Sequence, residues 1–252
     1  MSDTYTDKIQ EAAQRLGLKE IDSALENAFE EARKEDLSFA HALSNMFEQL
    51  ALEADERSKE ALIRFAKFPY RKTFDDFDFE FQTSISLTSL QSHIDEGYLS
   101  KCQNLIFLGP PGVGKTHVAT SFGMAAANSR NKVQFISCSE MIARLRESKE
   151  RNSYLRKLAS LARPTLLIID EVGYSTLTQD DSAMFFDVVC RRYERGSIII
   201  TSNKSYKHWG EIFSGDDVIA TAILDRLLHH SKSYVLKGTS YRMKERGKET
   251  KL

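Results

Sequence analysis

Residues 109–116, with the sequence GPPGVGKT, combine glycines with a lysine and a threonine at a fixed spacing. Gly112 and Gly114 have no Cβ, so the backbone can turn its N–H groups inward around phosphate oxygens. The Lys115 ammonium would reach the β- and γ-phosphates of ATP, and the Thr116 hydroxyl would bind Mg²⁺. The spacing therefore predicts a phosphate-binding loop made of Gly109, Pro110, Pro111, Gly112, Val113, Gly114, Lys115, Thr116 and His117.

The segments on either side of this loop argue against a chance match. The apolar run from Leu105 to Leu108 is typical of a buried strand in a parallel sheet. A helical pattern begins near Lys115, and the positive end of such a helix favours phosphate. His117 lies in that helix next to the loop, and we expect it to pack there rather than to take part in catalysis.

Two acidic residues end a second apolar run, LLIIDE, at residues 166–171. Ligands of α/β proteins bind at the carboxyl ends of strands, which is where these acids would lie. Asp170 would hold Mg²⁺ through its water shell. Glu171 would orient and polarise the attacking water. An acid that only caps the next turn is the alternative, but the separate strand 55 residues after Lys115 favours the nucleotide site.

A third apolar run, IIITSN, ends in Asn203. A side-chain amide both donates and accepts hydrogen bonds, so Asn203 could hold the attacking water against the γ-phosphate. The alternative is an ordinary asparagine in the turn that follows a strand.

The order of these elements predicts an α/β fold with a five-stranded parallel sheet. Residues 7–66 contain helical patterns, and we expect a small all-helical domain over residues 1–66. Residues 67–85 are rich in phenylalanine, and we expect them to pack on the ATPase domain at 86–252. The strands are predicted at 104–109, 132–137, 165–170, 197–203 and 233–238, and helices at 86–99, 115–129, 181–194 and 217–229, with a helical, basic stretch at 139–162.

Composition excludes some classes of protein. No apolar run is long enough to span a membrane, and the first residues do not resemble a signal peptide. The three cysteines are odd in number and far apart, which indicates a reduced, cytoplasmic protein without a zinc site. Residues 1–60 hold 15 acidic and 7 basic residues, a charge of −8, whereas the rest carries a charge of +7. The basic part could therefore meet a polyanion.

The motifs occur in the order of an AAA+ P-loop ATPase: Walker A, Walker B, sensor 1 and arginine finger. Within that superfamily the chain resembles the IstB-type transposition helpers and, more distantly, the DnaC and DnaI helicase loaders. The resemblance covers residues 16–246, and its narrower marks are KTFDDFDFEFQ, DEVGY, RYERGSIIITSNKSYKHWGEIF, AILDRLLHH and GTSYRMK.

This resemblance implies an ATPase that forms a homo-oligomer on double-stranded DNA and helps a transposase to choose its target. It implies catalytic roles for Glu171, Asn203 and Arg226, the last acting on the nucleotide of a neighbouring subunit. If Arg226 is not the finger, Arg191, Arg192 and Arg195 are the next candidates. The branch lacks a full C-terminal helical lid. Arg242 matches a family position just after the last strand, and the resemblance makes it a further candidate for nucleotide binding. The helical domain would contact sister subunits or the transposase.

A basic stretch at residues 141–163 is the expected DNA-binding surface, because cations bind the phosphate backbone with little base reading. The candidates are Arg144, Arg146, Lys149, Arg151, Arg156 and Lys157, followed by Arg163. The alternative is a solvated helical face with pairs such as Arg146–Glu150. A second candidate, expected to be a disordered end, is the tail with Arg242, Lys244, Arg246, Lys248 and Lys251.

Three other functions stay open at this point. A replicative helicase loader would share every catalytic motif. A phosphate-loop kinase would need a mobile lid and an acceptor pocket, whereas Glu171 and Asn203 favour water as the acceptor. A nucleotide-dependent scaffold would bind ATP and barely hydrolyse it.

Overall fold

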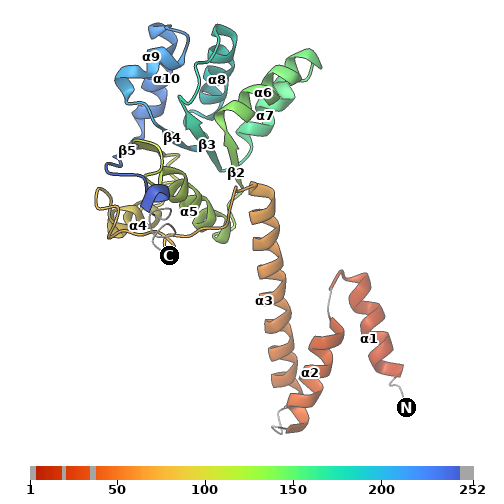
Figure 1. Ribbon diagram of the computed structural model, residues 1–252. Helices are drawn as coiled ribbons and strands as arrows, with labels where there is room; N and C mark the ends of the chain where they lie inside the picture. Colours follow the sequence, from red (N-terminus) through yellow and green to blue (C-terminus); the bar gives the residue numbers. More distant parts are fainter. Residues whose placement is uncertain (1–3, 19–20, 35–37, 245–252) are drawn as a thin grey trace. The chain divides into compact units, whose positions relative to one another are not determined.

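The computed structural model describes residues 4–18, 21–34 and 38–244 (Figure 1). The chain forms two compact units, residues 1–61 and residues 62–252. The first is helical, with α1 at Thr4–Arg15, α2 at Ile21–Lys34 and α3 at Phe39–Ala66, whose last turns belong to the second unit. Its small core brings together apolar residues one helical turn apart, among them Ala24, Met46 and Leu50.

The second unit is built around the predicted five-stranded parallel sheet, which confirms the fold class. Its strands lie in the order β2-β3-β4-β1-β5, and all four pairings are parallel. The strands are β1 Asn104–Leu108, β2 Val133–Ser137, β3 Leu166–Val172, β4 Ser197–Ser202 and β5 Ser231–Val235. The last strand thus begins two residues earlier than predicted and ends at Val235, because its register with β1 begins at Ser231.

Helices cover both faces of this sheet, in three layers (Figure 1). They are α4 Leu87–Asp95, α5 Lys115–Asn128, α6 Cys138–Glu150, α7 Tyr154–Ala162, α8 Gln179–Arg192, α9 Trp209–Ile212 and α10 Asp217–His229, with a 3₁₀ turn at Tyr206–His208. Among the described residues, no helix has the length and apolar character needed to cross a membrane.

The stretch predicted to be helical over residues 139–162 is divided into two helices, α6 and α7. Asn152 lies between them with a φ of 51°, a left-handed conformation that asparagine tolerates better than most residues. The Ser153 N–H donates to the Ser148 carbonyl at 2.8 Å, which ends α6 in the manner of a C-terminal cap. The basic stretch is therefore carried by two helices instead of one.

Alternation along the buried strands gives the sheet two apolar faces. On β1, Leu105 and Phe107 belong to the core under α4 and α5, whereas Ile106 and Leu108 belong to the core under α6, α8 and α10. The phenylalanine-rich segment packs against the first of these cores. Phe74, for example, lies edge-on to Phe122 of α5, with ring centroids 5.2 Å apart. Both faces of the strands are covered, so their carboxyl ends are held rigidly for the site described next.

Candidate nucleotide-binding site

The loop between β1 and α5 has the backbone conformation that its glycines predicted. Gly112 and Gly114 have φ values of 81° and 99°, in the region that favours glycine. A Cβ at Gly114 would lie 2.6 Å from the Phe77 ring, and one at Gly112 would lie 2.1 Å from Ser240 Oγ. The loop is therefore held closely between the phenylalanine-rich segment and the residues that follow β5.

Lys115 lies at the first position of α5, with its ammonium turned back onto the loop. The Nζ atom donates to the Gly109 carbonyl at 2.7 Å and to the Pro110 carbonyl at 2.8 Å. Burial lowers the pKa of Lys115, and the charges of Asp170 and Glu171 oppose this shift. An ammonium has three protons, so one N–H remains available for an anion in front of the loop.

Asp170 lies at the carboxyl end of β3 beside Thr116. The Thr116 hydroxyl lies 3.0 and 3.2 Å from the two carboxylate oxygens of Asp170. Burial raises the pKa of Asp170, and hydrogen bonds from Thr201 and Thr116 act against that shift. A hydroxyl and a carboxylate side by side form the oxygen-rich pair that Mg²⁺ prefers. The structure thus brings together the two residues predicted to hold the metal.

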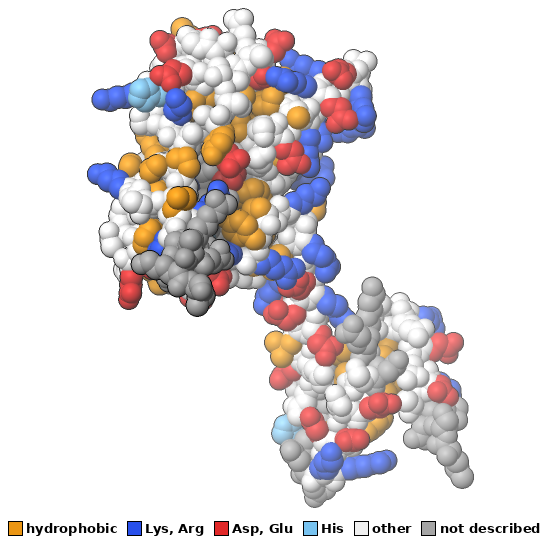
Figure 2. Space-filling view, in the orientation of Figure 1, with side chains coloured by type: hydrophobic (Ala, Val, Ile, Leu, Met, Phe, Trp, Pro, Cys, Tyr) orange, Lys and Arg blue, Asp and Glu red, His pale blue; other side chains and the backbone are white. Residues whose placement is uncertain are grey.

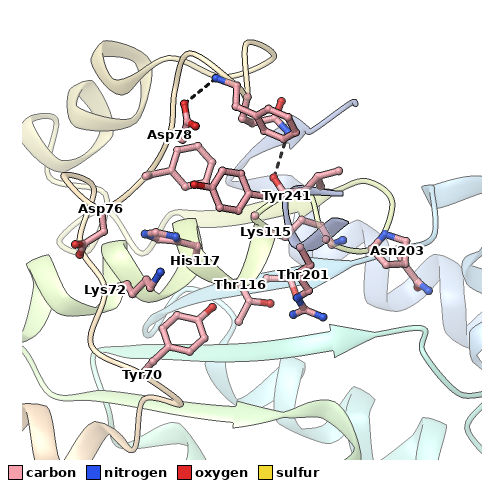
Figure 3. Close-up of a pocket in the computed structure, with 18 of the residues that line it drawn as sticks. Tyr70, Lys72, Asp76, Asp78, Lys115, Thr116, His117, Thr201, Asn203 and Tyr241 are labelled. Atoms are coloured by element: carbon pink, nitrogen blue, oxygen red, sulfur yellow. Dashed lines mark hydrogen bonds between the residues drawn. The ribbon is translucent and has the colours of Figure 1, made fainter. Parts of the chain in front are cut away.

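Glu171 and Asn203 line the same pocket as Lys115 and Thr116. Glu171 is exposed and has a φ of 61°, which is uncommon for a residue with a side chain. The Asn203 Oδ1 atom is buried and finds no hydrogen-bond partner within residues 4–18, 21–34 and 38–244. A buried polar atom without a partner is costly unless a ligand or water satisfies it. Figure 3 shows Lys115 and Thr116 between His117 on one side and Asn203 on the other.

Several residues of the pocket were missed by the sequence motifs. Gln82, from the phenylalanine-rich segment, donates from Nε2 to the Val113 carbonyl at 3.1 Å. After β5, the Tyr241 N–H donates to the Gly112 carbonyl at 3.0 Å. Both segments stood out in the sequence, but nothing in their spacing indicated that they enclose the loop. Further lining residues are Tyr70, Lys72, Asp76, Phe77, Asp78, Phe81, Tyr174 and Thr201.

His117 and Arg242 both line the pocket, as the set of candidate nucleotide-binding residues predicted. The His117 ring packs edge-on against Phe77, and Nε2 lies 2.9 Å from the Thr73 carbonyl. Its contacts are those of a packing residue. Arg242 is exposed, and its charge acts with burial to lower the pKa of Lys115. The Arg242 guanidinium and the Lys115 ammonium therefore both face the pocket.

Arg226 lies on α10 and does not line the pocket of its own chain. Its Nη1 donates to the Ala222 carbonyl at 2.9 Å, and its guanidinium lies 4.9 Å from the centroid of the Phe186 ring. Arg192 was one of the alternatives for the finger, and that alternative is wrong. It is 1% exposed, and its guanidinium donates to the carbonyls of Leu161, Ala162, Pro164, Thr165 and Ser197.

The basic stretch is less free than its sequence indicated. Figure 2 shows Lys and Arg side chains on the side of the molecule where α6 and α7 lie, with acidic side chains among them. Two of the cations form ion pairs one helical turn apart, Arg144 with Glu140 and Arg151 with Glu147. The Lys149 ammonium lies 5.4 Å from the Tyr154 ring centroid. Arg156 and Lys157 form no ion pair with any of residues 4–18, 21–34 and 38–244.

Arg146 does not form the pair with Glu150 that served as the example of a solvated helical face. Arg146 instead grips Asp181 of α8 with two hydrogen bonds, one of them 2.7 Å from Nε to Oδ1. Asp181 is 1% exposed and forms a capping box with Thr178 at the start of α8. A buried carboxylate is a stronger partner than an exposed Glu150, so Arg146 has a structural role.

The tail was expected to be disordered, yet Lys244 is held in place. Its Nζ lies 3.0 Å from Asp78 Oδ2, 4.4 Å from the Phe81 ring centroid and 5.2 Å from that of Tyr241. Arg246, Lys248 and Lys251 lie outside the described residues.

The residues present fit ATP and Mg²⁺. The loop backbone, the Lys115 ammonium and the N-terminus of α5 converge on one space, where triphosphate oxygens would accept hydrogen bonds. Thr116 and Asp170 offer the oxygen ligands for the ion, and the unsatisfied Asn203 Oδ1 would take a water.

Comparison with known proteins agrees with this geometry. The IstB-like ATP binding protein family matches residues 11–249. The chain belongs to this family. It is 41% identical over 240 residues to the insertion sequence IS5376 ATP-binding protein of Geobacillus stearothermophilus, covering 95% of each chain. It is 39% identical to the insertion sequence IS21 ATP-binding protein of Pseudomonas aeruginosa, covering 93% of this chain and 88% of that protein.

The fold of this IstB-like protein also occurs in solved structures. The DnaC helicase loader superposes with a TM-score of 0.52 at 21% identity, covering 60% of this chain and 88% of that chain. AMPPCP-bound DnaA from Aquifex aeolicus gives a TM-score of 0.58 at 15% identity, covering 73% of this chain and 56% of that chain. At these identities the likeness concerns the fold alone, which is an α/β P-loop NTPase fold.

Proposed function

We propose that this IstB-like protein is an ATPase that assembles on double-stranded DNA and assists the transposase of an insertion sequence in target selection and DNA insertion. The observation that supports ATPase activity is that Lys115, Thr116, Glu171 and Asn203 line one pocket. Asp170 is hydrogen-bonded to Thr116 at that pocket. The names of the curated relatives, which are insertion-sequence ATP-binding proteins, support the link to transposition.

Each residue of the pocket would have a separate task. Bound ATP with Mg²⁺ supplies the phosphoryl group to be transferred and the divalent charge that stabilises it. Lys115 would leave the Gly109 and Pro110 carbonyls and donate to phosphate oxygens, which are charged and therefore stronger acceptors. Asp170 and Thr116 would hold the ion.

Asn203 and Glu171 would hold and activate the attacking water. Asn203 would accept a hydrogen bond from the water at Oδ1, and the Glu171 carboxylate would take a proton from the water as its oxygen attacks the γ-phosphorus, while the bond from that phosphorus to the bridging oxygen breaks and ADP leaves. Glu171 is exposed to the pocket, whereas Asp170 is 6% exposed, so only Glu171 can reach a water in front of the γ-phosphate. This division of roles favours hydrolysis over transfer to a second substrate.

The proposed role of Arg226 as an arginine finger requires assembly. Because it lies outside the pocket of its own chain, it would act only on the nucleotide of a neighbouring subunit. The +7 charge of residues 61–252 supports duplex DNA as the surface on which such subunits gather. The acidic helical unit is then the candidate contact for the transposase or for sister subunits.

The proposal is tested by measuring phosphate release with and without duplex DNA, together with the sedimentation of the protein. We expect ATP to promote assembly on duplexes of any sequence and the duplex to stimulate phosphate release. A helicase loader is the competing function, and it would be favoured if the protein captured a replicative helicase and single-stranded DNA but neither duplex nor transposase.

A further inference from the structure

Thr201 lies on β4 within the IIITSN run, two residues before Asn203, and the sequence indicated no role for it. It is 1% exposed and also lines the pocket. Its hydroxyl contacts both acids at the end of β3. The Glu171 N–H donates to Thr201 Oγ1 at 2.9 Å, and Oγ1 lies 2.5 Å from Asp170 Oδ1.

The directions of these hydrogen bonds follow from the groups involved. A backbone N–H can only donate, so the Thr201 oxygen accepts the bond from Glu171. The single hydroxyl proton of Thr201 is then free to donate to the carboxylate of Asp170. One hydroxyl therefore fixes the backbone of the residue that would activate water and the side chain of the residue that would bind the metal.

The sheet leaves a place for this hydroxyl. Near the carboxyl ends of β3 and β4, Ile169 lies opposite Ile200 and Val172 lies opposite Ser202, and the register shifts between these two pairs. Asp170 and Glu171 therefore lie opposite Thr201 alone, as in a β-bulge. A bulge takes backbone groups out of the ladder, and a buried N–H must find another acceptor. The Thr201 side chain is that acceptor for Glu171.

The bulge also explains the unusual backbone of Glu171. Its φ of 61° persists only where the surroundings hold it. The hydrogen bond to Thr201 is one such restraint, and it keeps the Glu171 side chain facing the pocket, next to a buried Asp170.

We propose that Thr201 is a positioning residue, which aims Glu171 at the water and orients Asp170 toward Mg²⁺. This inference rests on the proposed ATPase function. It adds that the strand ending in Asn203 is coupled to the two acids through one hydroxyl, so that β3 and β4 present the reacting groups as a unit.

Thr201→Val tests this directly, because valine keeps the shape of threonine and removes the hydroxyl. Thr201→Ser restores the hydroxyl without the methyl group and should rescue. Ser202→Ala is the matched control. Ser202 is also buried on β4 and bonds across to β3, its Oγ donating to the Val172 carbonyl at 2.6 Å, but it does not line the pocket.

Three quantities should be measured on each variant: the Mg²⁺ concentration for half-maximal binding of a fluorescent ATP analogue, phosphate release, and the melting temperature. Removing a group that orients a metal ligand typically costs about 10- to 100-fold in metal affinity or activity. We expect that loss in Thr201→Val for both Mg²⁺ requirement and kcat, with analogue affinity in EDTA unchanged. Thr201→Ser should approach wild type, and Ser202→Ala should change only the melting temperature.

The inference is overturned if Thr201→Val needs no more Mg²⁺ than wild type, or if Ser202→Ala shifts the Mg²⁺ requirement equally. If Thr201→Val fails to fold, Thr201→Ser and Thr201→Ala carry the test, and equal Mg²⁺ requirements in those two overturn it. The binding measurement does not depend on turnover. Should the wild-type protein release no phosphate, the proposed hydrolysis fails while the Mg²⁺ titration still decides the role of Thr201.

Discussion

The pocket and the basic stretch were both predicted from short runs of residues. In the structure the pocket residues come together in one place, whereas half of the candidate cations are paired within the chain. In the pocket, the residues of three separate motifs lie on the loop after β1 and at the ends of β3 and β4, and they face one space. On α6 and α7, three of the six candidate DNA-binding cations already form ion pairs with carboxylates of the chain. Spacing along buried strands predicts a site better than a count of charges on exposed helices, because strand ends are fixed by the core.

Substitution of Arg226 is expected to have the largest effect. Arg226 lies outside the pocket of its own chain, and it already contacts the Ala222 carbonyl and the Phe186 ring. If it acts as a finger in a neighbouring site, Arg226→Ala should bind ATP normally and lose about 10³- to 10⁵-fold in turnover. Single-turnover phosphate release on duplex DNA would measure the loss.

A mixture of variants then tells whether Arg226 acts between subunits. Arg226→Ala has an intact loop, and Lys115→Ala has an intact finger. Mixed on DNA, they should recover part of the activity that neither shows alone. If both proteins assemble together and remain inactive, the finger belongs to another residue, with Arg191 and Arg195 next.

Inside the pocket, Lys115→Ala should lower the affinity for ATP. Losing charge-assisted hydrogen bonds of about 1.5–3 kcal/mol would weaken ATP binding by roughly 10- to 100-fold. Titration with a fluorescent ATP analogue measures the change. Lys72→Ala is a fitting control, because Lys72 also lines the pocket but lies outside the loop. Equal losses of ATP affinity in both variants would contradict the assignment of Lys115 as the lysine that binds the phosphates.

What could be predicted from the sequence follows the same division. Lys115 and Thr116 could be predicted from the spacing of the glycine-rich loop, and Asp170 and Asn203 from their places at the ends of apolar runs. Gln82 and Tyr241 were missed, since only tertiary packing brings the segments before β1 and after β5 onto the loop. Thr201 was missed because its role depends on a bulge that alternation along a strand does not reveal.

The basic stretch can be tested by comparing its paired and unpaired cations. The double variant Arg156→Ala with Lys157→Ala removes cations for which no ion pair is described. Each lost phosphate contact should flatten the slope of log affinity against log salt by about 0.9. The paired Arg144→Ala with Arg151→Ala should change the slope less. Fluorescence anisotropy with duplexes of unrelated sequence measures both, and two unchanged slopes would move the DNA site to another face.

The substitution Arg146→Gln is expected to have the smallest effect, and it should change stability instead of DNA binding. Although burial acts against it, the hydrogen bonds from Arg146 and Thr178 lower the pKa of Asp181 to about 2. Because folding lowers the pKa of Asp181, its ionised carboxylate stabilises the folded protein at pH values above the usual pKa of 3.8. This contribution is lost as the pH falls toward 2. Arg146→Gln should therefore cost a few tenths to about 1 kcal/mol at pH 7, and less at acid pH.

Urea unfolding of wild type and Arg146→Gln at pH 7 and pH 3 measures this cost, with Arg144→Gln as the control for an exposed ion pair. A cost that grows on acidification would contradict the assignment of Asp181 as the partner.

The central claim is that Glu171 activates water in a pocket whose other residues bind the nucleotide. Glu171→Gln keeps the size of the side chain and removes the base, while Lys115, Thr116 and Asp170 are untouched. The decisive measurement is phosphate release by this variant on duplex DNA, made alongside its affinity for ATP. We predict unchanged affinity, a loss of about 10²- to 10⁴-fold in release, and a stable assembly trapped on DNA. Release at the wild-type rate, with ATP bound as tightly as before, would contradict the account.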